Sequence, residues 1–401
     1  MKIGMILDSS FPPDPRVENE ASALIRNGHS VYLLALDYTN TQAKEEKINN
    51  INVQRVFPGK IIYKLSALAY TIPFYHLYFL YIIKSFLRDN QIEAIHIHDI
   101  QISRAVFWAN RQFQLPVTLD LHENRPEIMK YYSHVNSIIG KLLVRPRIWK
   151  KFEYKYIKKA DKVIIVTESA AEYYKDELNI SKEKFVIVPN TVTESFYKDP
   201  FIEDSIIESY RNYFTLLYLG DTGKRRGLEV AIKSINLIKK NIPQIKLCVI
   251  GSSGYDSKLK ELIAEEGVED FVDMHGWQDF TLFPSYIKAC KIGICPLHKN
   301  IHHDTTYANK IIQTLSYGKP MLVSNSDAQK KLIEKYRCGL VFTDRNIQDF
   351  KEKVFSLYSD KELYTKYAEN AKYAVENHLK WEILSNPLIH TYQSYERNKD
   401  Q

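Results

Sequence analysis

Cysteine is scarce in this sequence, with four residues in 401 and no C-x-x-C pair. Two of them, Cys248 and Cys295, fall inside apolar runs typical of strands, where a free thiol packs as a small hydrophobic side chain. This spacing argues against a zinc site and against a fold held by disulfides. We therefore expect a protein of the reducing cytoplasm.

Three short motifs that carry chemistry are also missing. No D-x-D pair occurs, so the paired carboxylates that commonly hold a divalent metal are absent. The first strand is not followed by G-x-G-x-x-G, which disfavours a dinucleotide there. Gly223-Lys224 is followed by Arg225 instead of Ser or Thr, which excludes a P-loop. We predict neither a metal nor a cofactor.

Signals for nucleic acid and for export are lacking too. The net charge of +7 is modest for this length and permits attraction to phosphorylated ligands or an anionic membrane. No recognition helix, zinc-finger spacing or RNA-binding aromatic signature accompanies it, so nucleic acid is not an expected partner. No apolar signal region follows the first strand, which predicts no signal peptide.

A long uncharged run is present at 65–83. Nineteen residues could just span a bilayer, but the run contains Pro73, His76 and four tyrosines. A buried helix within 61–89 explains it better, and partial contact with a membrane surface is left open.

The chain is long enough for two domains, and its 45% apolar and 26% charged residues are normal for a globular enzyme. Strand and helix patterns alternate along it, which predicts two doubly wound α/β halves. We place the first domain at 1–200 and the second at 201–376.

The stretch 302–334 is the strongest candidate for a ligand site. Its pattern predicts a polar loop at 302–306, a helix over 308–317 and then a short buried strand. The amino end of a helix presents unpaired N–H groups and a partial positive charge, so it favours an anion such as a diphosphate. The residues on the first turns of this helix are Asn309, Lys310 and Gln313.

A glycine-rich loop at 220–227 opens the second domain, directly after a predicted strand. Glycine lets the backbone approach a diphosphate closely, and Lys224, Arg225 and Arg226 add positive charge.

Asn309-Lys310, Gln313 and Gly318-Lys319-Pro320 together resemble the donor-binding signature of the retaining nucleotide-sugar glycosyltransferases of family 4, which have the GT-B fold. The resemblance covers nearly the whole chain and implies two Rossmann-like domains facing a cleft, with a last helix (377–401) that packs back on the first domain. The family has glutamates where this chain has Thr305 and Gln313. A glutamine still accepts a hydrogen bond from a ribose hydroxyl, but more weakly than a carboxylate.

The same resemblance implies roles for individual residues. Arg226 and Lys310 would stabilise the leaving diphosphate, and Gln313 would hold the ribose. His303, Asp304 and Thr305 would contact the sugar, and the leaving phosphate itself would take the acceptor proton. The complete expected donor-binding set is Gly223, Arg226, His303, Asp304, Thr305, Ala308, Asn309, Lys310 and Gln313.

The first domain supplies the other candidates. His122 follows a predicted strand and matches the family histidine next to the transferred sugar; the alternative is a core histidine bonded to backbone. The proline-rich loop before Arg16 resembles the acceptor-side loop, so Arg16 would reach a phosphate or glycan, unless it caps a neighbouring loop. Glu123 is a weaker acceptor-side candidate.

Nine lysines and arginines stand between Ile128 and Ala160 against the single acid Glu153, with four aromatic residues interleaved. This pattern fits a basic amphipathic helix on anionic lipid at the inner face of the cell membrane. It fits equally a helix that packs its aromatics inward and leaves its charges in solvent.

The resemblance, together with these features, implies a retaining, metal-independent hexosyltransferase that moves a sugar from a UDP- or GDP-sugar to a glycan or lipid-linked acceptor, in cell-surface polysaccharide or glycoconjugate assembly. Two alternatives are a nucleotide-sugar epimerase or hydrolase of the same fold, and a binding subunit that has lost activity along with the two glutamates.

Overall fold

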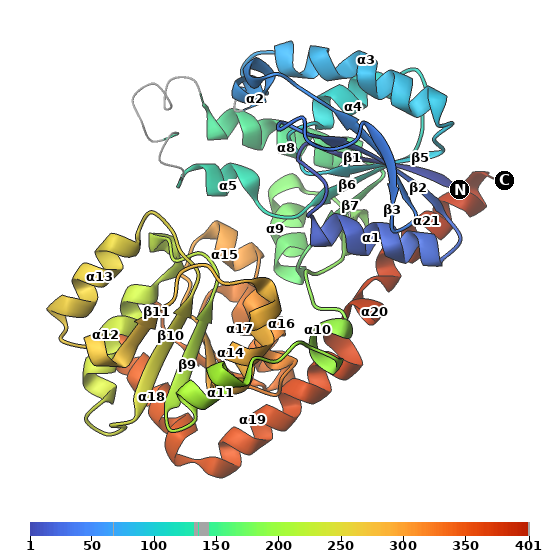
Figure 1. Cartoon of the computed structure of the whole chain (residues 1–401). Coiled ribbons are helices and arrows are strands. Elements are labelled where there is room, and N and C mark those ends of the chain that lie inside the picture. The colour runs from blue at the N-terminus through green and yellow to red at the C-terminus, as the bar shows by residue number, and fades with distance from the viewer. Residues whose placement is uncertain (67, 132–134, 136–143, 400–401) are drawn as a thin grey trace. The chain divides into compact units, whose positions relative to one another are not determined.

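The computed structural model describes all residues except 67, 132–134, 136–143 and 400–401 (Figure 1). The chain forms two compact units. Unit 1 comprises Met1–Pro189 and Ser385–Gln401, and unit 2 comprises Asn190–Leu384. The domain boundaries predicted from the sequence follow residues 200 and 376, whereas the two units divide after Pro189 and after Leu384.

Unit 1 is built on an eight-stranded sheet that is parallel except at one edge. Its central strands run as buried, mostly apolar segments, as expected for parallel strands covered on both faces. The strands in spatial order are β3 (Glu45–Ile48), β4 (Ile51–Val56), β2 (Ser30–Leu36), β1 (Lys2–Leu7), β5 (Ala94–His98), β6 (Val117–Leu121), β7 (Lys162–Ile165) and β8 (Phe185–Ile187). The edge hairpin β3–β4 is antiparallel.

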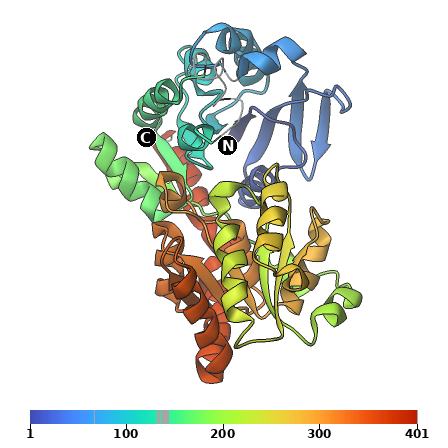
Figure 2. The ribbon, with the colours of Figure 1, turned by 90° about the vertical axis from the view of Figure 1, so that its left-hand side faces the viewer.

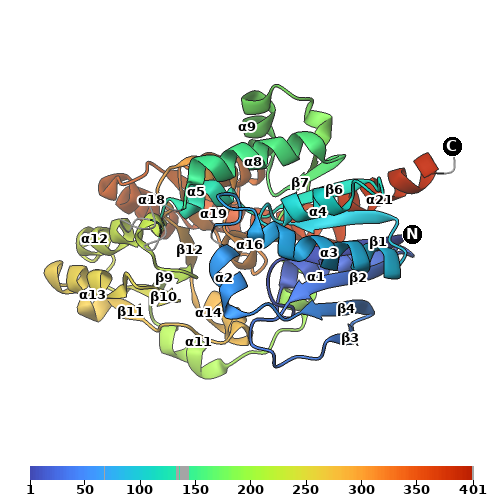
Figure 3. The ribbon, with the colours of Figure 1, turned by 90° about the horizontal axis from the view of Figure 1, so that it is seen from above.

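Helices cover both faces of this sheet. Figures 1 and 3 show α3, α4 and α8 over one face, with α1 on the other. The helices are α1 (Pro15–Arg26), α2 (Lys60–Ser66), α3 (Phe74–Asp89), α4 (Ser103–Ala109), α5 (Arg125–Met129), α8 (Pro146–Lys159), α9 (Glu168–Leu178) and α21 (Asn386–Lys399). Helix α1 begins where Asp14 caps it, since the carboxylate accepts from the N–H groups of Arg16 and Val17 at 3.2 Å each.

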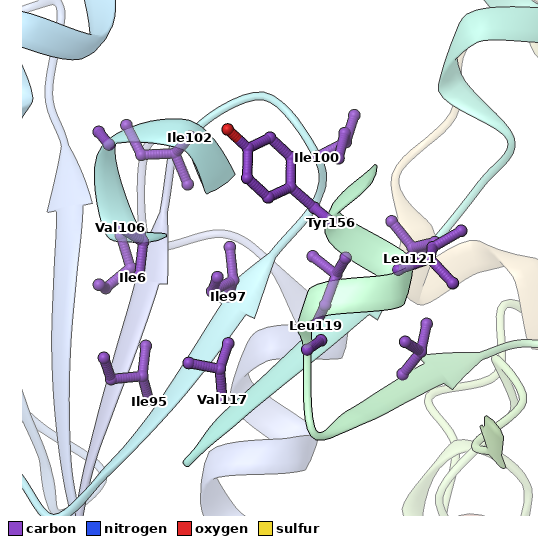
Figure 4. Packing of buried hydrophobic residues seen from close by; sticks show 14 of the residues in the cluster. Ile6, Ile95, Ile97, Ile100, Ile102, Val106, Val117, Leu119, Leu121 and Tyr156 are labelled. Atoms are coloured by element: carbon purple, nitrogen blue, oxygen red, sulfur yellow. The ribbon is translucent and has the colours of Figure 1, made fainter. Parts of the chain in front are cut away.

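The core between the sheet and α4 is made of branched aliphatic side chains. Ile95 and Ile97 of β5 point toward Ile102 and Val106, and Tyr156 of α8 packs over the same layer (Figure 4). These residues are at most 2% exposed, so side chains from β5, α4 and α8 form one continuous apolar core.

The uncharged run at 65–83 does not form the single buried helix that was predicted. Pro73 lies between α2 and α3, and α3 buries Tyr75, Phe79 and Ile83 on one side only. Proline lacks the N–H that a continuous helix would need. Among the helices that the structure describes, none has the length and apolar character to cross a membrane.

The basic segment at 128–160 lies partly outside the described residues. Its described part includes α8, in which Trp149 and Tyr156 are 1% and 2% exposed. Lys151, Lys155 and Lys158 are exposed on the opposite side of α8. The predicted inward packing of the aromatics is therefore confirmed, while the lipid contact stays a prediction.

Unit 2 contains a six-stranded parallel sheet. Its strands in spatial order are β11 (Val272–Met274), β10 (Ile245–Ile250), β9 (Phe214–Leu219), β12 (Ile292–Cys295), β13 (Met321–Ser324) and β14 (Gly339–Phe342). After β9 the chain adds strands first on one side and then on the other. The strand order therefore reverses at β9, where open α/β sheets bind their ligands.

Helices α12, α13 and α18 share one core with the unit 2 sheet, and α12 and α13 lie in front of that sheet in Figure 2. Helices α14, α16 and α17 pack with its other face. The helices of unit 2 are α10 (Ser195–Lys198), α11 (Asp204–Tyr210), α12 (Leu228–Ile238), α13 (Asp256–Glu265), α14 (Phe283–Ala289), α15 (Ile301–Thr305), α16 (Asn309–Leu315), α17 (Asp327–Tyr336), α18 (Ile347–Ser359), α19 (Lys361–Ala374) and α20 (Trp381–Leu384). Both units thus have the predicted doubly wound architecture.

Helix α21 packs on unit 1 through specific polar contacts. The Tyr392 hydroxyl lies 2.8 Å from His96 Nδ1, and the Tyr395 hydroxyl lies 3.1 Å from Thr118 Oγ1. Both partners are on central strands of the sheet, so the end of the chain completes one face of unit 1.

Candidate functional site

At the carboxyl edge of the unit 2 sheet, Gly220 is the first residue of the glycine-rich loop that follows β9. Its N–H donates to Ile250 O at 2.8 Å. Gly251 ends the neighbouring strand with φ at +130°, and a Cβ there would lie 2.0 Å from Gly220 O. The two loops therefore meet backbone to backbone at the position where the strand order reverses, and only glycine allows this approach.

The loop continues into a short 3₁₀ turn, Lys224–Arg226, closed by Gly227 with φ at +72°. A Cβ on Gly227 would lie 2.0 Å from Pro296 O, so this loop also packs against the segment after β12. Asp221 shapes the turn by accepting from the Gly223 N–H at 2.8 Å, and its carboxylate lies 3.4 Å from Arg226 Nε. The Arg226 side chain is 18% exposed. Its guanidinium is thus held at the loop without full burial.

Lys310 comes to the same place from α16. It is 7% exposed, and its Nζ lies 3.3 Å from the centre of the Tyr218 ring. Burial lowers the pKa of Lys310 to about 7, and the nearby charge of Arg226 acts in the same direction. Ala308, the residue before the first residue of α16, caps this helix with its backbone only, without a side-chain hydrogen bond to the first N–H groups. The predicted combination of Arg226, Lys310 and a helix amino end is therefore brought together in unit 2.

The prediction of a polar loop at 302–306 is wrong in part, because residues 301–305 form helix α15. The reason is an effective N-cap: the Asn300 side chain accepts from the His303 N–H at 3.1 Å. His303 Nδ1 donates to His298 O at 2.7 Å, and burial lowers the pKa of His303 to about 3. The imidazole is therefore neutral, with its Nε2 lying 3.5 Å from Arg225 Nη1.

The other residues of this segment hold the local backbone together. Thr305 Oγ1 donates to Ile301 O at 2.8 Å, and Asp304 accepts from the Asp327 N–H at 3.0 Å. These contacts place both side chains at the start of the loop that leads into α16. Asn309 and Gln313 are four residues apart and therefore lie on the same side of α16. Asn309 is exposed and Gln313 is half-buried.

The carboxyl edge of the unit 1 sheet carries a cluster of charged side chains around Asp120. The Asp120 carboxylate accepts from Arg16 Nη2 at 2.7 Å and from His122 Nε2 at 2.6 Å. His98 Nδ1 lies 3.4 Å from the same carboxylate. Burial alone would lower the pKa of His122, but the charge of Asp120 and the hydrogen bond to it raise that pKa to about 9. His122 is accordingly an imidazolium at neutral pH, and its side chain is 19% exposed.

Arg16 lies inside this cluster. Its guanidinium also pairs with Glu20 at 3.0 Å and donates to Val188 O at 3.0 Å, and its side chain is 8% exposed. The contact with Val188 matches the alternative interpretation of Arg16 as a residue that holds a neighbouring loop. Glu123 is exposed beside His122.

Within the described residues, one group has the donor types of a metal site. A nitrogen or oxygen from each of Glu20, His96, His98 and Asp120 lies within 4.8 Å of the others, and all four residues are buried. The Arg16 guanidinium already pairs with both carboxylates, so the cluster is balanced by a fixed cation. We therefore interpret it as an ion-pair network.

Sequence reasoning missed Asp120, His98 and Tyr218. The first two were detectable, because polar residues at the carboxyl ends of parallel strands meet at one edge of the sheet. The strings H-x-H-D at 96–99 and D-x-H at 120–122 both stand at such ends. Tyr218 sits within an apolar strand, and nothing in its local pattern signals a contact with Lys310.

Comparisons with known proteins identify the family of this chain. The family model "Glycosyl transferases group 1" matches residues 202–374, and the model "Glycosyltransferase Family 4" matches residues 16–196. The poly(glycerol-phosphate) alpha-glucosyltransferase of Bacillus subtilis is 24% identical over 57% of this chain and 33% of its own length. The alpha-D-kanosaminyltransferase of Streptomyces kanamyceticus is 21% identical over 69% of this chain and 71% of its own length.

Solved structures share the fold of the whole chain. Sucrose-phosphate synthase from Thermosynechococcus elongatus superposes with a TM-score of 0.79 at 14% identity, covering 99% of this chain and 100% of that one. Anabaena HepE in complex with UDP superposes with a TM-score of 0.74 at 15% identity, covering 98% and 100%. The two family models, one on each unit, and the shared fold show that this chain belongs to the group 1 glycosyltransferases and has the GT-B fold.

Proposed function

We propose that this enzyme transfers a hexose, with retention of configuration, from a UDP- or GDP-sugar to a hydroxyl of a glycan or lipid-linked acceptor. The observation that carries the proposal is the convergence of Arg226, Lys310 and the start of α16 at the reversal point of the unit 2 sheet. The guanidinium of Arg226, the amine of Lys310 and the amino end of α16 suit the charge of a diphosphate.

In this proposal the donor site stabilises the leaving diphosphate electrostatically. Arg226 and Lys310 neutralise the diphosphate as it leaves, and Gly223 and Asn309 border it. Gln313 accepts from a ribose hydroxyl. His303 contacts the sugar together with Asp304 and Thr305. The leaving phosphate takes the acceptor proton, so neither a metal nor a dedicated base is part of the mechanism.

Unit 1 is proposed to serve the acceptor and the sugar through His122. A protonated imidazole donates hydrogen bonds only, which suits a hydroxyl or phosphate oxygen. Asp120 fixes the orientation of this ring and keeps its proton. Arg16 then acts through Asp120, and Glu123 remains a proposed acceptor contact.

Names of relatives and neighbours support the substrate class. Solved neighbours hold UDP and UDP-glucose, and one relative is named for transfer of glucose to poly(glycerol-phosphate). We infer a role in cell-surface polysaccharide or glycoconjugate assembly, with UDP-sugars as the first donors to test.

The decisive experiment incubates the purified chain with UDP- and GDP-hexoses, with and without glycan or polyprenyl-phosphate acceptors, in the presence of EDTA. Formation of an α-linked product from an α-linked donor supports the proposal. Release of free sugar or an epimerised donor alone would instead identify a hydrolase or epimerase. Absence of both turnover and nucleotide binding would leave an inactive binding subunit.

Gln313 provides a prediction for the donor site. Gln313→Ala is expected to weaken UDP binding by about 0.5–1.5 kcal/mol, the usual net value of a neutral hydrogen bond. Gln313→Glu is expected to keep or strengthen binding, because a carboxylate is the stronger acceptor. Calorimetric titration of the three proteins measures both effects. Unchanged affinity in both variants would remove Gln313 from the ribose site.

We further propose that unit 1 docks at the inner face of the cell membrane. Four apolar side chains follow one side of α3 at helical spacing, with exposures between 37% and 76%: Phe74, Leu77, Tyr78 and Tyr81. The exposed lysines of α8 lie on the same face of the sheet. Aromatic and basic side chains together suit the interface of an anionic bilayer.

The expected result is binding to vesicles that contain anionic lipid, weakening with salt by screening. Changing Lys151, Lys155 and Lys158 to Glu should reduce it by about 1 kcal/mol per lysine. A control with the same charge change on unit 2 uses the exposed lysines Lys260, Lys361 and Lys366. Co-sedimentation that responds equally to both triple variants would refute specific docking of α8.

A further inference from the structure

The surroundings of Lys310 have an unusual feature: its ammonium group has an aromatic ring as its nearest partner. The Nζ lies 3.3 Å from the Tyr218 ring centre, and Tyr218 is 0% exposed. A Cβ at Gly220 would lie 3.8 Å from the same Nζ, so the end of the lysine fills the space beside this glycine. The lysine is therefore placed at the glycine loop by packing.

Few charges compensate this buried ammonium. Asp221 faces it, but that carboxylate already accepts from the Gly223 N–H and lies 3.4 Å from Arg226 Nε. Arg226 adds a second positive charge nearby. Cys295 faces it from β12, and burial raises the pKa of that thiol, which keeps it neutral. Burial likewise raises the pKa of the Tyr218 hydroxyl.

A cation in such a place is stabilised by the ring face but lacks a counter-charge. A diphosphate entering beside Gly220 would supply one. Its negative charge favours the protonated lysine, in the same way that any nearby anion raises the pKa of a base. Ligand binding and protonation at this site are then linked.

We propose that the nucleotide diphosphate binds with uptake of one proton by Lys310, and that the Tyr218 ring positions the ammonium for it. The inference rests on the proposed function, since it assumes that unit 2 binds a nucleotide diphosphate. It adds that the empty site holds the lysine partly neutral and that Tyr218 is a positioning residue of the donor site.

The first measurement is the number of protons bound with UDP, from calorimetry at pH 8 in two buffers of different ionisation enthalpy. At pH 8 the terminal phosphate of UDP is fully ionised, because its pKa is about 6. With the pKa of free Lys310 at about 7, roughly a tenth of the lysine is protonated beforehand, so about 0.9 proton is taken up. The affinity for UDP is expected to fall about fivefold from pH 7 to 8 and about tenfold from pH 8 to 9.

Variants separate Lys310 from its neighbours. His302 and His303 are buried near Arg226 and are neutral, so each is an alternative site of proton uptake. His298, which pairs with Asp344, packs against the same loop at Gly227. Lys310→Met should abolish the uptake and flatten the pH profile of binding. Tyr218→Phe keeps the ring and should keep the parent profile. Tyr218→Leu removes the ring and should shift the profile to lower pH.

The outcomes distinguish the two proposals. UDP binding without proton uptake, or uptake that persists in Lys310→Met, overturns the inference and leaves the donor site intact. A Tyr218→Leu protein that folds and keeps the parent pH profile removes Tyr218 from the mechanism. Failure of the parent to bind UDP or GDP at any pH would overturn the proposed function together with the inference.

Discussion

The Arg226→Ala enzyme is expected to lose about 10²–10³-fold in kcat, the usual effect of removing one preorganised charge donor from a transition state. The guanidinium is held at the glycine loop, and its interaction with the diphosphate grows as negative charge develops on the leaving group. The effect should therefore appear in kcat more than in KM.

Lys224→Ala is the matched control. Lys224 belongs to the same 3₁₀ turn but is exposed, so its loss removes the same formal charge without a fixed contact. Steady-state kinetics with the preferred donor compare the two variants. Equal losses in both would show that only the general positive potential of the loop matters, and near-parent turnover in Arg226→Ala would remove this residue from the mechanism.

Asp120→Asn is expected to give the largest loss of stability, about 3–5 kcal/mol. The substitution preserves shape but leaves the buried Arg16 and the partly buried His122 without their shared carboxylate. Urea unfolding of unit 1, followed by intrinsic fluorescence, measures the change. Asp89→Asn is the control, because Asp89 is exposed and its pair with Arg88 contributes little. A loss below 1 kcal/mol would mean that the network is not a source of stability.

The same variant should change the pH dependence of stability. The pKa of His122 is about 9 in the folded protein and 6.5 in the unfolded chain. The contribution of His122 to the free energy of unfolding is therefore complete below pH 6.5 and is lost as the pH rises through 9. The parent should lose stability between pH 6.5 and 9, and Asp120→Asn should lose much less over that range.

The sequence was sufficient for the architecture because parallel strands buried on both faces leave continuous apolar runs. It also located the glycine loop at 220–227, since glycine is required where backbones approach as closely as Gly251 and Gly220 do. Both features depend on local patterns of a few residues.

The parts that could not be predicted depend on distant pairs. The partner of Arg16 is 104 residues away in sequence, so the local pattern was compatible with an acceptor contact or with capping of a neighbouring loop and gave no sign of the buried ion pair. Helix α15 was missed because its start depends on the single cap Asn300. The contact of Lys310 with Tyr218 joins a helix to a strand, and neither segment alone indicates it.

The return of α21 to unit 1 has a consequence for the order of folding during synthesis. Unit 2 is one continuous stretch, Asn190–Leu384, and has all its residues before α21 is made. Unit 1 has all eight strands of its sheet much earlier but lacks Tyr392 and Tyr395 until α21 has been made. Until then His96 Nδ1 and Thr118 Oγ1 lack the tyrosine hydroxyls that they contact in the finished unit. A nascent chain should therefore finish unit 2 first, although it is encoded second, and unit 1, which is encoded first, should become stable last.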